Sequence, residues 1–196
     1  MILPSKELVK ILISRILAPN GIKLIGANSR ILRPRKIDGP KHIEIGTGTF
    51  IRAYSWLSAI ERYGSQNFKP RFSIGNHVYI GHYAFITCID SVTIEDYCVL
   101  SDCVYISDSA HGYDPDKGPI MQQPLTSKGL VRIGKGSFLG YRAVIMPGVT
   151  LGKHCVVGCN TVVTSSFPDY CMIVGSPARC IKIYSTESKC WITQKF

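Results

Sequence analysis

An aliphatic residue recurs at every sixth position over most of this chain of 196 residues. Fifteen positions in four blocks share this register, and all are Ile, Leu or Val: Ile45, Ile51, Leu57; Ile74, Ile80, Ile86; Ile94, Leu100, Ile106; Ile133, Leu139, Ile145, Leu151, Val157, Val163. A helix repeats its apolar positions about every 3.6 residues, and a half-buried strand repeats them every second residue. A period of six therefore predicts neither a helix bundle nor an ordinary sandwich, but a prism of short strands joined at corners.

Each hexad predicts one short strand and one corner, so three hexads close a triangular coil. The aliphatic residue fills the interior, and the residue four positions later is small because it lies near the corner, as at Ser55, Ala84 and Cys98. Gly often follows the aliphatic residue, which we interpret as the need for an unusual turn conformation. Stacked coils would pair their strands about 4.8 Å apart. The expected fold is all-β, a parallel β-helix of about five coils.

Breaks in the register predict where the chain leaves the prism. The five expected coils are 45–62, 74–91, 94–111, 133–150 and 151–168. They are separated by an insert at 63–73, by Val92 and Thr93, and by a long loop at 112–132. A structureless excursion of that length in a compact domain is usually functional or disordered.

Three regions are expected along the chain. Residues 1–42 form a basic N-terminal cap segment, 43–177 the β-helix catalytic domain, and 178–196 a tail with a strand and a helix. Apolar periodicity predicts a short amphipathic helix at 5–18. That helix either caps the open end of the prism or docks at a membrane interface.

Basic residues concentrate at the two ends of the chain. Residues 1–42 contain nine Lys or Arg against two Asp or Glu, residues 43–178 contain ten of each, and residues 179–196 contain four against one. The neutral body lacks the basic face and the motifs of a nucleic-acid-binding protein, so no nucleic acid partner is expected. The ends instead favour an anionic membrane surface or a phosphorylated substrate, with solvated basic tails as the alternative.

The eight cysteines are expected to be reduced thiols of a cytoplasmic protein. Charged residues interrupt the apolar residues at the start of the chain, so no signal peptide is expected. No run approaches the roughly 20 apolar residues of a membrane span. The cysteine spacings match no zinc template, and Cys98 and Cys155 occupy small inward positions typical of buried thiols. Contact with the inner face of the cell membrane would be peripheral.

Chemistry is expected on the outer surface, because aliphatic side chains fill the interior. His111 is the last residue of the third expected coil, where the long loop begins, and is a candidate general base. Counting one coil plus the two inserted residues places it above Ser91. Asp90 would then orient the imidazole or bind a sugar hydroxyl. Asp108 and Asp114 are nearby alternatives for that role.

The hexads, the His that precedes a loop, and the closing run together resemble the left-handed β-helix acetyltransferases. The closing run contains Ile133-Gly-Lys-Gly-Ser-Phe-Leu-Gly, Val157-Gly-Cys-Asn and Val174-Gly-Ser-Pro-Ala-Arg. The resemblance covers about residues 43–184. It is closest to bacterial O-acetyltransferases of O-antigen, colanic acid and capsule synthesis, with the maltose and galactoside acetyltransferases as cousins. It implies a homotrimer with acetyl-CoA along each cleft between subunits and His111 as the base.

The resemblance also implies roles for further residues. The CoA-binding set would be Gly140, Tyr141, Cys159, Thr164, Ser165, Arg179 and Lys182. The first two would supply backbone contacts at the thioester, the middle three would line the pantetheine path, and the last two would meet the phosphates. Acceptor-side candidates are Gly81, His82 and Phe138. Several relatives carry Asn in place of Gly81, and relatives often carry Trp in place of Phe138.

The expected function is an acetyl-CoA-dependent O-acetyltransferase. Its carbohydrate acceptor would be a sugar hydroxyl in a surface polysaccharide or its lipid-linked precursor. The alternative is an N-acetyltransferase of a nucleotide-linked amino sugar, with the same fold and base. A zinc site is not expected, because His77, His82 and His111 have coil offsets that do not stack. A non-catalytic scaffold is a further alternative, against which the His111 corner and the CoA-type tail argue.

Overall fold

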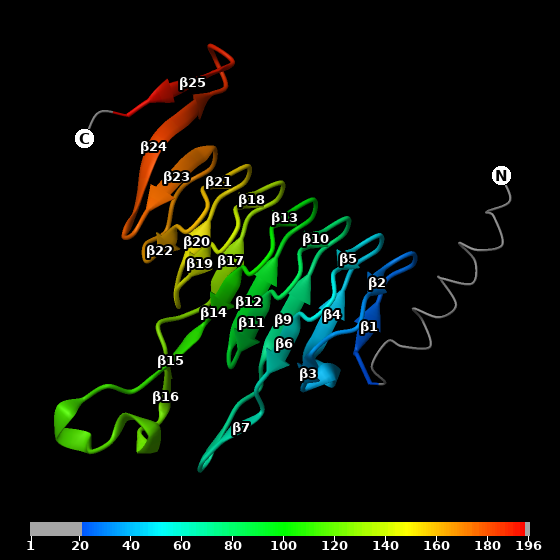
Figure 1. Cartoon of the computed structure of the whole chain (residues 1–196), viewed down its shortest axis with the longest axis vertical. Coiled ribbons are helices and arrows are strands. Elements are labelled where there is room, and N and C mark those ends of the chain that lie inside the picture. The colour runs from blue at the N-terminus through cyan, green and yellow to red at the C-terminus, as the bar shows by residue number, and fades with distance from the viewer. Residues whose placement is uncertain (1–20, 195–196) are drawn as a thin grey trace, which may run out of the picture.

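The computed structural model describes residues 21–194, which form a three-sided prism of stacked coils with two excursions (Figure 1). Sheet A stacks β1 (Leu24–Ile25), β4 (Ile43–Ile45), β9 (Arg71–Ile74), β12 (Ser91–Ile94), β17 (Val131–Ile133) and β20 (Thr150–Leu151). Sheet B stacks β2 (Arg30–Ile31), β5 (Phe50–Ile51), β10 (Tyr79–Ile80), β13 (Val99–Leu100), β18 (Phe138–Leu139), β21 (Val156–Val157) and β23 (Cys171–Gly175). Sheet C stacks β3 (Lys36–Asp38), β6 (Trp56–Ala59), β11 (Phe85–Cys88), β14 (Tyr105–Ser107), β19 (Val144–Ile145) and β22 (Val162–Val163).

The predicted hexads stack in register, which confirms the left-handed parallel β-helix. Leu100, for example, pairs with Ile80 on one side and with Leu139 on the other. All fifteen aliphatic positions are at most 2% exposed. The small corner residues are buried with them, including Ser55 and Cys98 at 0%. One continuous apolar column thus runs through the coils.

The glycines that follow the aliphatic residues have a different cause from the one expected. Gly46 and Gly81 do not have positive φ; the left-handed positions lie two residues later, at Gly48 and Tyr83. A Cβ at Gly46 would lie 2.6 Å from the carbonyl carbon of Gly75 in the next coil. Glycine is required there because successive coils approach too closely for a side chain.

The prism begins before residue 43. Residues 24–38 supply β1, β2 and β3, one strand to each sheet, so they form a coil of the prism and not a separate cap. Each of sheets A and C therefore has six strands. Ile25, Ile31 and Ile37 are also six residues apart, and an eight-residue step to Ile45 separates this register from the next. The helix expected at 5–18 lies outside the described residues.

The C-terminal tail adds strands to sheet B where a strand and a helix were expected. β24 (Ala178–Ser185) pairs antiparallel with β23, and β25 (Cys190–Thr193) pairs antiparallel with β24. The helices within residues 21–194 are three short 3₁₀ turns: η1 (Pro40–His42), η2 (Pro115–Lys117) and η3 (Ile120–Gln122). None of the helices in this range is long and apolar enough to cross a membrane.

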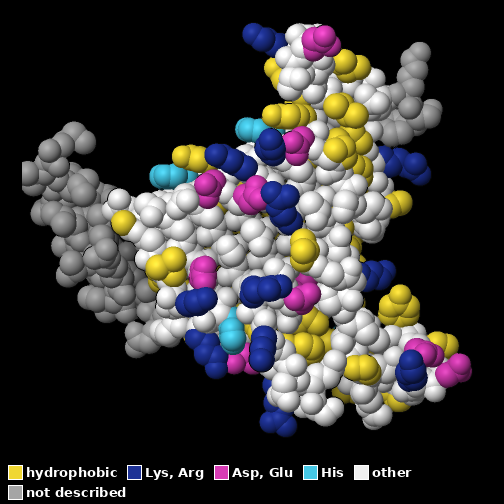
Figure 2. Space-filling model, turned by 180° about the vertical axis from the view of Figure 1, so that it is seen from behind, with side chains coloured by type: hydrophobic (Ala, Val, Ile, Leu, Met, Phe, Trp, Pro, Cys, Tyr) yellow, Lys and Arg dark blue, Asp and Glu magenta, His cyan; other side chains and the backbone are white. Residues whose placement is uncertain are grey.

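The outer surfaces of the three sheets differ in polarity. The outward row of sheet C carries Trp56, Phe85 and Tyr105, whose rings contact in sequence at 4.9 and 5.5 Å. Sheet B presents a second apolar row that includes Tyr79 and Phe138. Sheet A instead carries ion pairs, and Figure 2 shows basic and acidic side chains interleaved across one face of the molecule. The corner between sheets B and C therefore lies between two apolar faces.

Candidate active site

Between β14 and β17 the chain leaves the prism as an arm, residues 108–130. β15 (Ser109–His111) pairs antiparallel with β16 (Leu125–Ser127), and η2 and η3 close the far end. Gln123, 3% exposed, donates its amide N–H groups to the carbonyls of Asp114 and Gly118, each at 2.8 Å. The long loop expected at 112–132 thus has regular structure, stabilised by its own polar contacts.

The arm changes the expected position of His111. Coil counting placed His111 above Ser91, but Ser91 pairs with Arg71 and lies in sheet A. His111 pairs with Leu125 outside the prism. The count was wrong because the chain turns outward at Asp108, before the third coil is complete.

Asp108 anchors this turn from a fully buried position, with 0% exposure. Its carboxylate accepts the backbone N–H of Ile89 at 2.9 Å and those of Asp90 and Ser91 at 2.8 Å each. These donors belong to the corner of the coil below. A buried carboxylate with three backbone donors is well satisfied. Asp108 therefore stabilises the root of the arm and does not face a substrate, contrary to its expected role.

A second excursion braces the arm. It is the hairpin of β7 (Arg62–Tyr63) and β8 (Gln66–Asn67), within the predicted insert. The side chain of Gln66 accepts the N–H of Leu125 at 2.7 Å and donates to its carbonyl at 3.0 Å. This two-way contact satisfies both backbone groups of a residue that is only 8% exposed.

Tyr63, from the same hairpin, is the side chain that contacts His111. The two ring centroids lie 5.4 Å apart at 72°, and the Tyr63 hydroxyl lies 3.4 Å from His111 Nδ1. The hydroxyl donates its one proton to the carbonyl of Met121 at 3.1 Å. Towards His111 it can therefore only accept, which requires the proton on Nδ1 and leaves the Nε2 lone pair free. In this tautomer the exposed imidazole can accept a proton at Nε2.

Asp90, which was expected to orient His111, and Asp114, one of its alternatives, have other partners. The Asp90 carboxylate lies 3.7 Å from the guanidinium of Arg71 on sheet A. Asp114 caps η2 and forms an ion pair with Lys117 at 3.0 Å. The Lys117 ammonium and the Asp116 N–H hold the pKa of Asp114 below its usual value. No hydrogen bond joins either carboxylate to His111 within residues 21–194.

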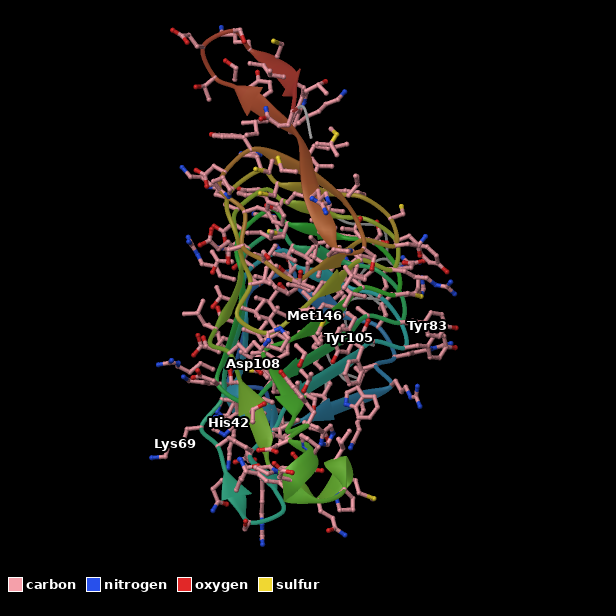
Figure 3. The ribbon with its side chains drawn as sticks, turned by 90° about the vertical axis from the view of Figure 1, so that its left-hand side faces the viewer. His42, Lys69, Tyr83, Tyr105, Asp108 and Met146 are labelled. Atoms are coloured by element: carbon pink, nitrogen blue, oxygen red, sulfur yellow. The ribbon has the colours of Figure 1, made fainter. Side chains whose placement is uncertain are left out.

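The acceptor-side candidates lie on a different part of the prism. Gly81 and His82 are at the corner between sheets B and C, and Phe138 is on the outer row of sheet B. Arg52 Nε donates to His82 Nε2 at 3.0 Å, and the carboxylate of Asp102 accepts the backbone N–H of His82 at 2.7 Å. In Figure 3, Tyr83 of this corner lies on the opposite side of the prism from Asp108.

The residues expected to bind CoA occupy three places in the chain. Gly140, Tyr141 and Cys159 lie at the corner between sheets B and C, on successive coils. Thr164 and Ser165 are exposed immediately after β22. Arg179 and Lys182 lie on β24, opposite Val174 and Met172 of β23. The arm leaves the prism at the corner between sheets C and A, so a single chain does not bring Gly140, Tyr141 and Cys159 together with His111.

Several backbone donors at this corner have no acceptor within residues 21–194, among them the N–H groups of Tyr141 and Cys159. Gly140 N–H, an expected contact for the thioester, already donates to the carbonyl of Val157 at 2.8 Å. The N–H of His82, two coils below, is capped by the Asp102 carboxylate, but Tyr141 has Cys159 at the capping position. Tyr141 N–H has no acceptor in the described part of the chain. It is one of the donors that this corner can offer to an incoming oxygen.

The three histidines considered for zinc are separated. His77 stacks on Tyr97 with centroids 5.1 Å apart, His82 binds Arg52, and His111 contacts Tyr63. Over residues 21–194 no group of three or more His, Cys, Asp or Glu side chains has a metal-binding arrangement.

Sequence reasoning missed Tyr63, Gln66 and Arg52, which hold the candidate histidines or the arm. The signal available for the first two was their position in the insert between two coils, since an insert next to a loop can contact it. No periodic pattern marks them, because each contact joins residues far apart in sequence.

Comparison with known proteins connects this architecture with acyl transfer. A family model described as the hexapeptide repeat of succinyl-transferase matches residues 130–165. A probable acetyltransferase of Mycobacterium tuberculosis is 34% identical over 71% of this chain. The chain spans 44% of that protein's length.

Two further relatives resemble the chain over more of their length. The Bacillus cereus N-acyltransferase AntD, solved with dTDP and coenzyme A, has a TM-score of 0.72 and covers 94% of this chain and 92% of its own at 22% identity, a likeness of fold. The putative lipopolysaccharide biosynthesis O-acetyl transferase WbbJ of Escherichia coli is 33% identical over 65% of this chain and 76% of WbbJ. This identity and the stacked hexads show that the chain belongs to the hexapeptide-repeat acetyltransferases.

Proposed function

We propose that the chain is an acetyl-CoA-dependent O-acetyltransferase acting on a sugar hydroxyl of a surface polysaccharide or its lipid-linked precursor. The observation that carries this proposal is the imidazole of His111, whose Nε2 is left free by the contact of Nδ1 with Tyr63. A hydroxyl needs a base to become a good nucleophile, whereas a neutral amine already carries its lone pair. The similarity to WbbJ supports the same acceptor class.

The reaction we propose is direct transfer. His111 Nε2 takes the hydroxyl proton as the sugar oxygen attacks the thioester carbonyl, and a new carbon–oxygen bond forms. Tyr141 N–H donates to the oxygen that becomes negative. The carbon–sulfur bond then breaks, and the bonding pair leaves with sulfur as the CoA thiolate. The proton on His111 then passes to solvent or to the thiolate.

This mechanism requires more than one copy of the chain. His111 belongs to the arm at the corner between sheets C and A, whereas Tyr141 is at the corner between sheets B and C. We infer a homotrimer in which the arm of one subunit reaches the Tyr141 corner of its neighbour. The apolar rows on sheets B and C supply two different surfaces, as a closed head-to-tail ring requires. Three 21.7-kDa chains are expected in analytical ultracentrifugation.

The CoA set remains as inferred from the family. Cys159, Thr164 and Ser165 would line the pantetheine path, and Arg179 and Lys182 would pair with the phosphates. The acceptor side would include Phe138 and the corner of Gly81 and His82. No residue of these sets is required to hold a metal.

A peripheral contact with an anionic membrane surface is a further part of the proposal. Residues 21–42 of the described chain contribute six Lys or Arg against one Asp at the N-terminal end of the prism. Binding to anionic vesicles is expected to weaken at high salt, because the ions screen such contacts. Binding that does not change with salt would contradict it.

The alternative is an N-acetyltransferase of a nucleotide-linked amino sugar. It is supported by an Escherichia coli dTDP-4-amino-4,6-dideoxy-D-glucose acyltransferase that is 28% identical over 81% of both chains. The fold would be unchanged, and only the nucleophile would differ.

The test is thiol release from acetyl-CoA in the presence of a panel of acceptors. The panel contains oligosaccharides that bear only hydroxyls, amino sugar nucleotides and their N-acetylated forms as controls. Release with a hydroxyl-only oligosaccharide supports the O-acetyltransferase. Release only with a free amino sugar establishes the alternative, and no release with any acceptor contradicts both.

A further inference from the structure

A groove of about 660 Å³ crosses the outer surface of sheet A, apart from the candidate CoA set. Its walls carry the cations Lys23, Lys41, Lys69 and Arg71, and its floor includes the hydroxyls of Ser91 and Thr93. The groove lies over β4, β9 and β12, towards the N-terminal end of the prism. No residue expected to bind CoA lines it.

Two of the four cations are neutralised within the groove or at its rim. Lys23 pairs with Glu44 at 2.6 Å, and Lys41 pairs with Glu61 at 2.8 Å. Lys69 has no ion pair within residues 21–194. The Arg71 side chain is 78% exposed, and its guanidinium forms only a long ion pair with the Asp90 carboxylate, at 3.7 Å. Lys69 and Arg71, on either side of Pro70, therefore present most of their charge to the groove.

The groove adjoins the root of the arm that carries His111. At one end, Arg71 pairs with Asp90, whose N–H binds the buried Asp108. His111 is the third residue after Asp108, a reach of at most about 10 Å along the chain. Figure 3 shows His42 and Lys69 on the same side of the molecule as Asp108.

The same end of the groove leads to the hairpin, because Ile43 pairs with Phe72 and His42 therefore lies beside Arg71. His42 contacts Glu61 at 3.2 Å, and Tyr63, two residues after Glu61, contacts His111. This end of the groove is thus linked to the candidate base through two short chains of contacts. A ligand held in the groove by one end could place its other end near the arm.

We propose that this groove binds a diphosphate group, and that Lys69 and Arg71 are its principal ligands. Arg pairs with phosphate oxygens through two parallel N–H donors, and Lys contributes a compact charge. The inference rests on the proposed function: the acceptor would be a sugar linked through diphosphate to a nucleotide or to a polyprenyl lipid. Lys69, which has no ion pair within residues 21–194, and the exposed, loosely paired Arg71 suit one short, doubly charged group. A nucleic acid backbone would need a longer basic track.

Binding is tested by calorimetric titration of the full chain with inorganic pyrophosphate and with UDP. The variant Lys69→Ala/Arg71→Ala is expected to weaken both affinities by at least tenfold, because charge-assisted hydrogen bonds are lost. Lys153→Ala is the matched control, since Lys153 is on the same face at the other end and pairs with Asp169 at 3.5 Å. Absence of pyrophosphate binding, or an equal loss in the control, would overturn the proposal.

Kinetics separate this inference from the proposed function. With a diphosphate-linked sugar, the double variant is expected to raise KM at least tenfold while KM for acetyl-CoA stays constant. With the same sugar lacking diphosphate, the variant and the parent should have equal KM. Equal rises for both acceptors would refute the groove. If no acceptor supports thiol release but pyrophosphate still binds with the expected variant effects, the groove stands and the transferase proposal fails.

Two series of kinetic measurements, each with a different acceptor, identify the source of the diphosphate. One supplies a nucleotide diphosphate sugar, and the other a polyprenyl diphosphate sugar in detergent. The acceptor for which the double variant raises KM belongs to the physiological class. If the double variant changes KM for neither acceptor, the proposal is contradicted.

Discussion

Leu100 and His111 are close in sequence, but they belong to regions that are stabilised in different ways. Leu100 pairs with a strand on each side, and its side chain is fully buried. His111 pairs with a single strand, on the arm, and is exposed beside Tyr63. The prism repeats one contact pattern many times, whereas the arm depends on a few contacts that occur once. Most of the stability and the proposed chemistry thus belong to separate regions of the chain.

The largest expected effect comes from His111→Ala. Loss of a general base typically lowers kcat by about 10² to 10⁴-fold. The thermal unfolding midpoint should not change, because the side chain is exposed and outside the prism. CoA binding measured by calorimetry should also be retained. Unchanged turnover would show that another group is the base.

The reverse separation is expected for Leu100→Ala. Removing a fully buried leucine side chain costs roughly 2 to 5 kcal/mol of unfolding free energy. The matched control, Met121→Ala in the arm, should change stability by less than about 0.5 kcal/mol, since Met121 is 78% exposed. Chemical denaturation at one fixed protein concentration measures both. A similar loss in the two variants would mean that prism and arm unfold as one unit.

Buried thiols should make the prism sensitive to alkaline pH. Burial raises the pKa of the Cys98 thiol to about 11 from an ordinary 9.0. Above pH 9 the unfolded chain loses this proton first, so the unfolding free energy falls as pH rises to 11, by at most roughly 3 kcal/mol. Denaturation at several pH values should show a shallower fall in Cys98→Ala. The exposed Cys159→Ala should keep the parental slope, and identical slopes in all three would refute this assignment.

The smallest expected effect is that of Tyr63→Phe. The ring remains, but the hydroxyl that accepts from His111 Nδ1 is lost, and a neutral hydrogen bond is worth about 0.5 to 1.5 kcal/mol. We expect kcat to fall about two- to tenfold with KM unchanged. Tyr113→Phe is the control, because Tyr113 is in the arm that carries His111 and is 70% exposed. Equal effects in the two variants would remove Tyr63 from the positioning of the base.

The prism could be predicted from sequence because its contacts repeat. Each hexad places the same residue type at the same position of the repeat, so Ile45 and Val163 both predict a buried position. The first coil shows the limit of this approach. Ile25, Ile31 and Ile37 keep the period, but the longer step to Ile45 hides their relation to the next coil.

The position of the arm could be predicted from the sequence, but its internal contacts could not. The phase break before residue 133 marked an excursion, and His111 was correctly placed near its start. The turn at Asp108 depends on three N–H donors of another coil, and Tyr63 reaches His111 from another insert. Neither contact has a local sequence signature. Periodicity therefore cannot predict which side chain contacts His111.

The antiparallel strands at the C-terminal end have a consequence for size. β24 and β25 close sheet B, and two coils, β17 to β19 and β20 to β22, lie between the arm and this closure. Each coil adds one strand spacing of about 4.8 Å. The distance from His111 to Arg179 is therefore set by a whole number of strand spacings. Insertion or deletion of three hexads, which make one coil, would change the distance from His111 to Arg179 by one strand spacing. The contacts within all the remaining coils would stay intact.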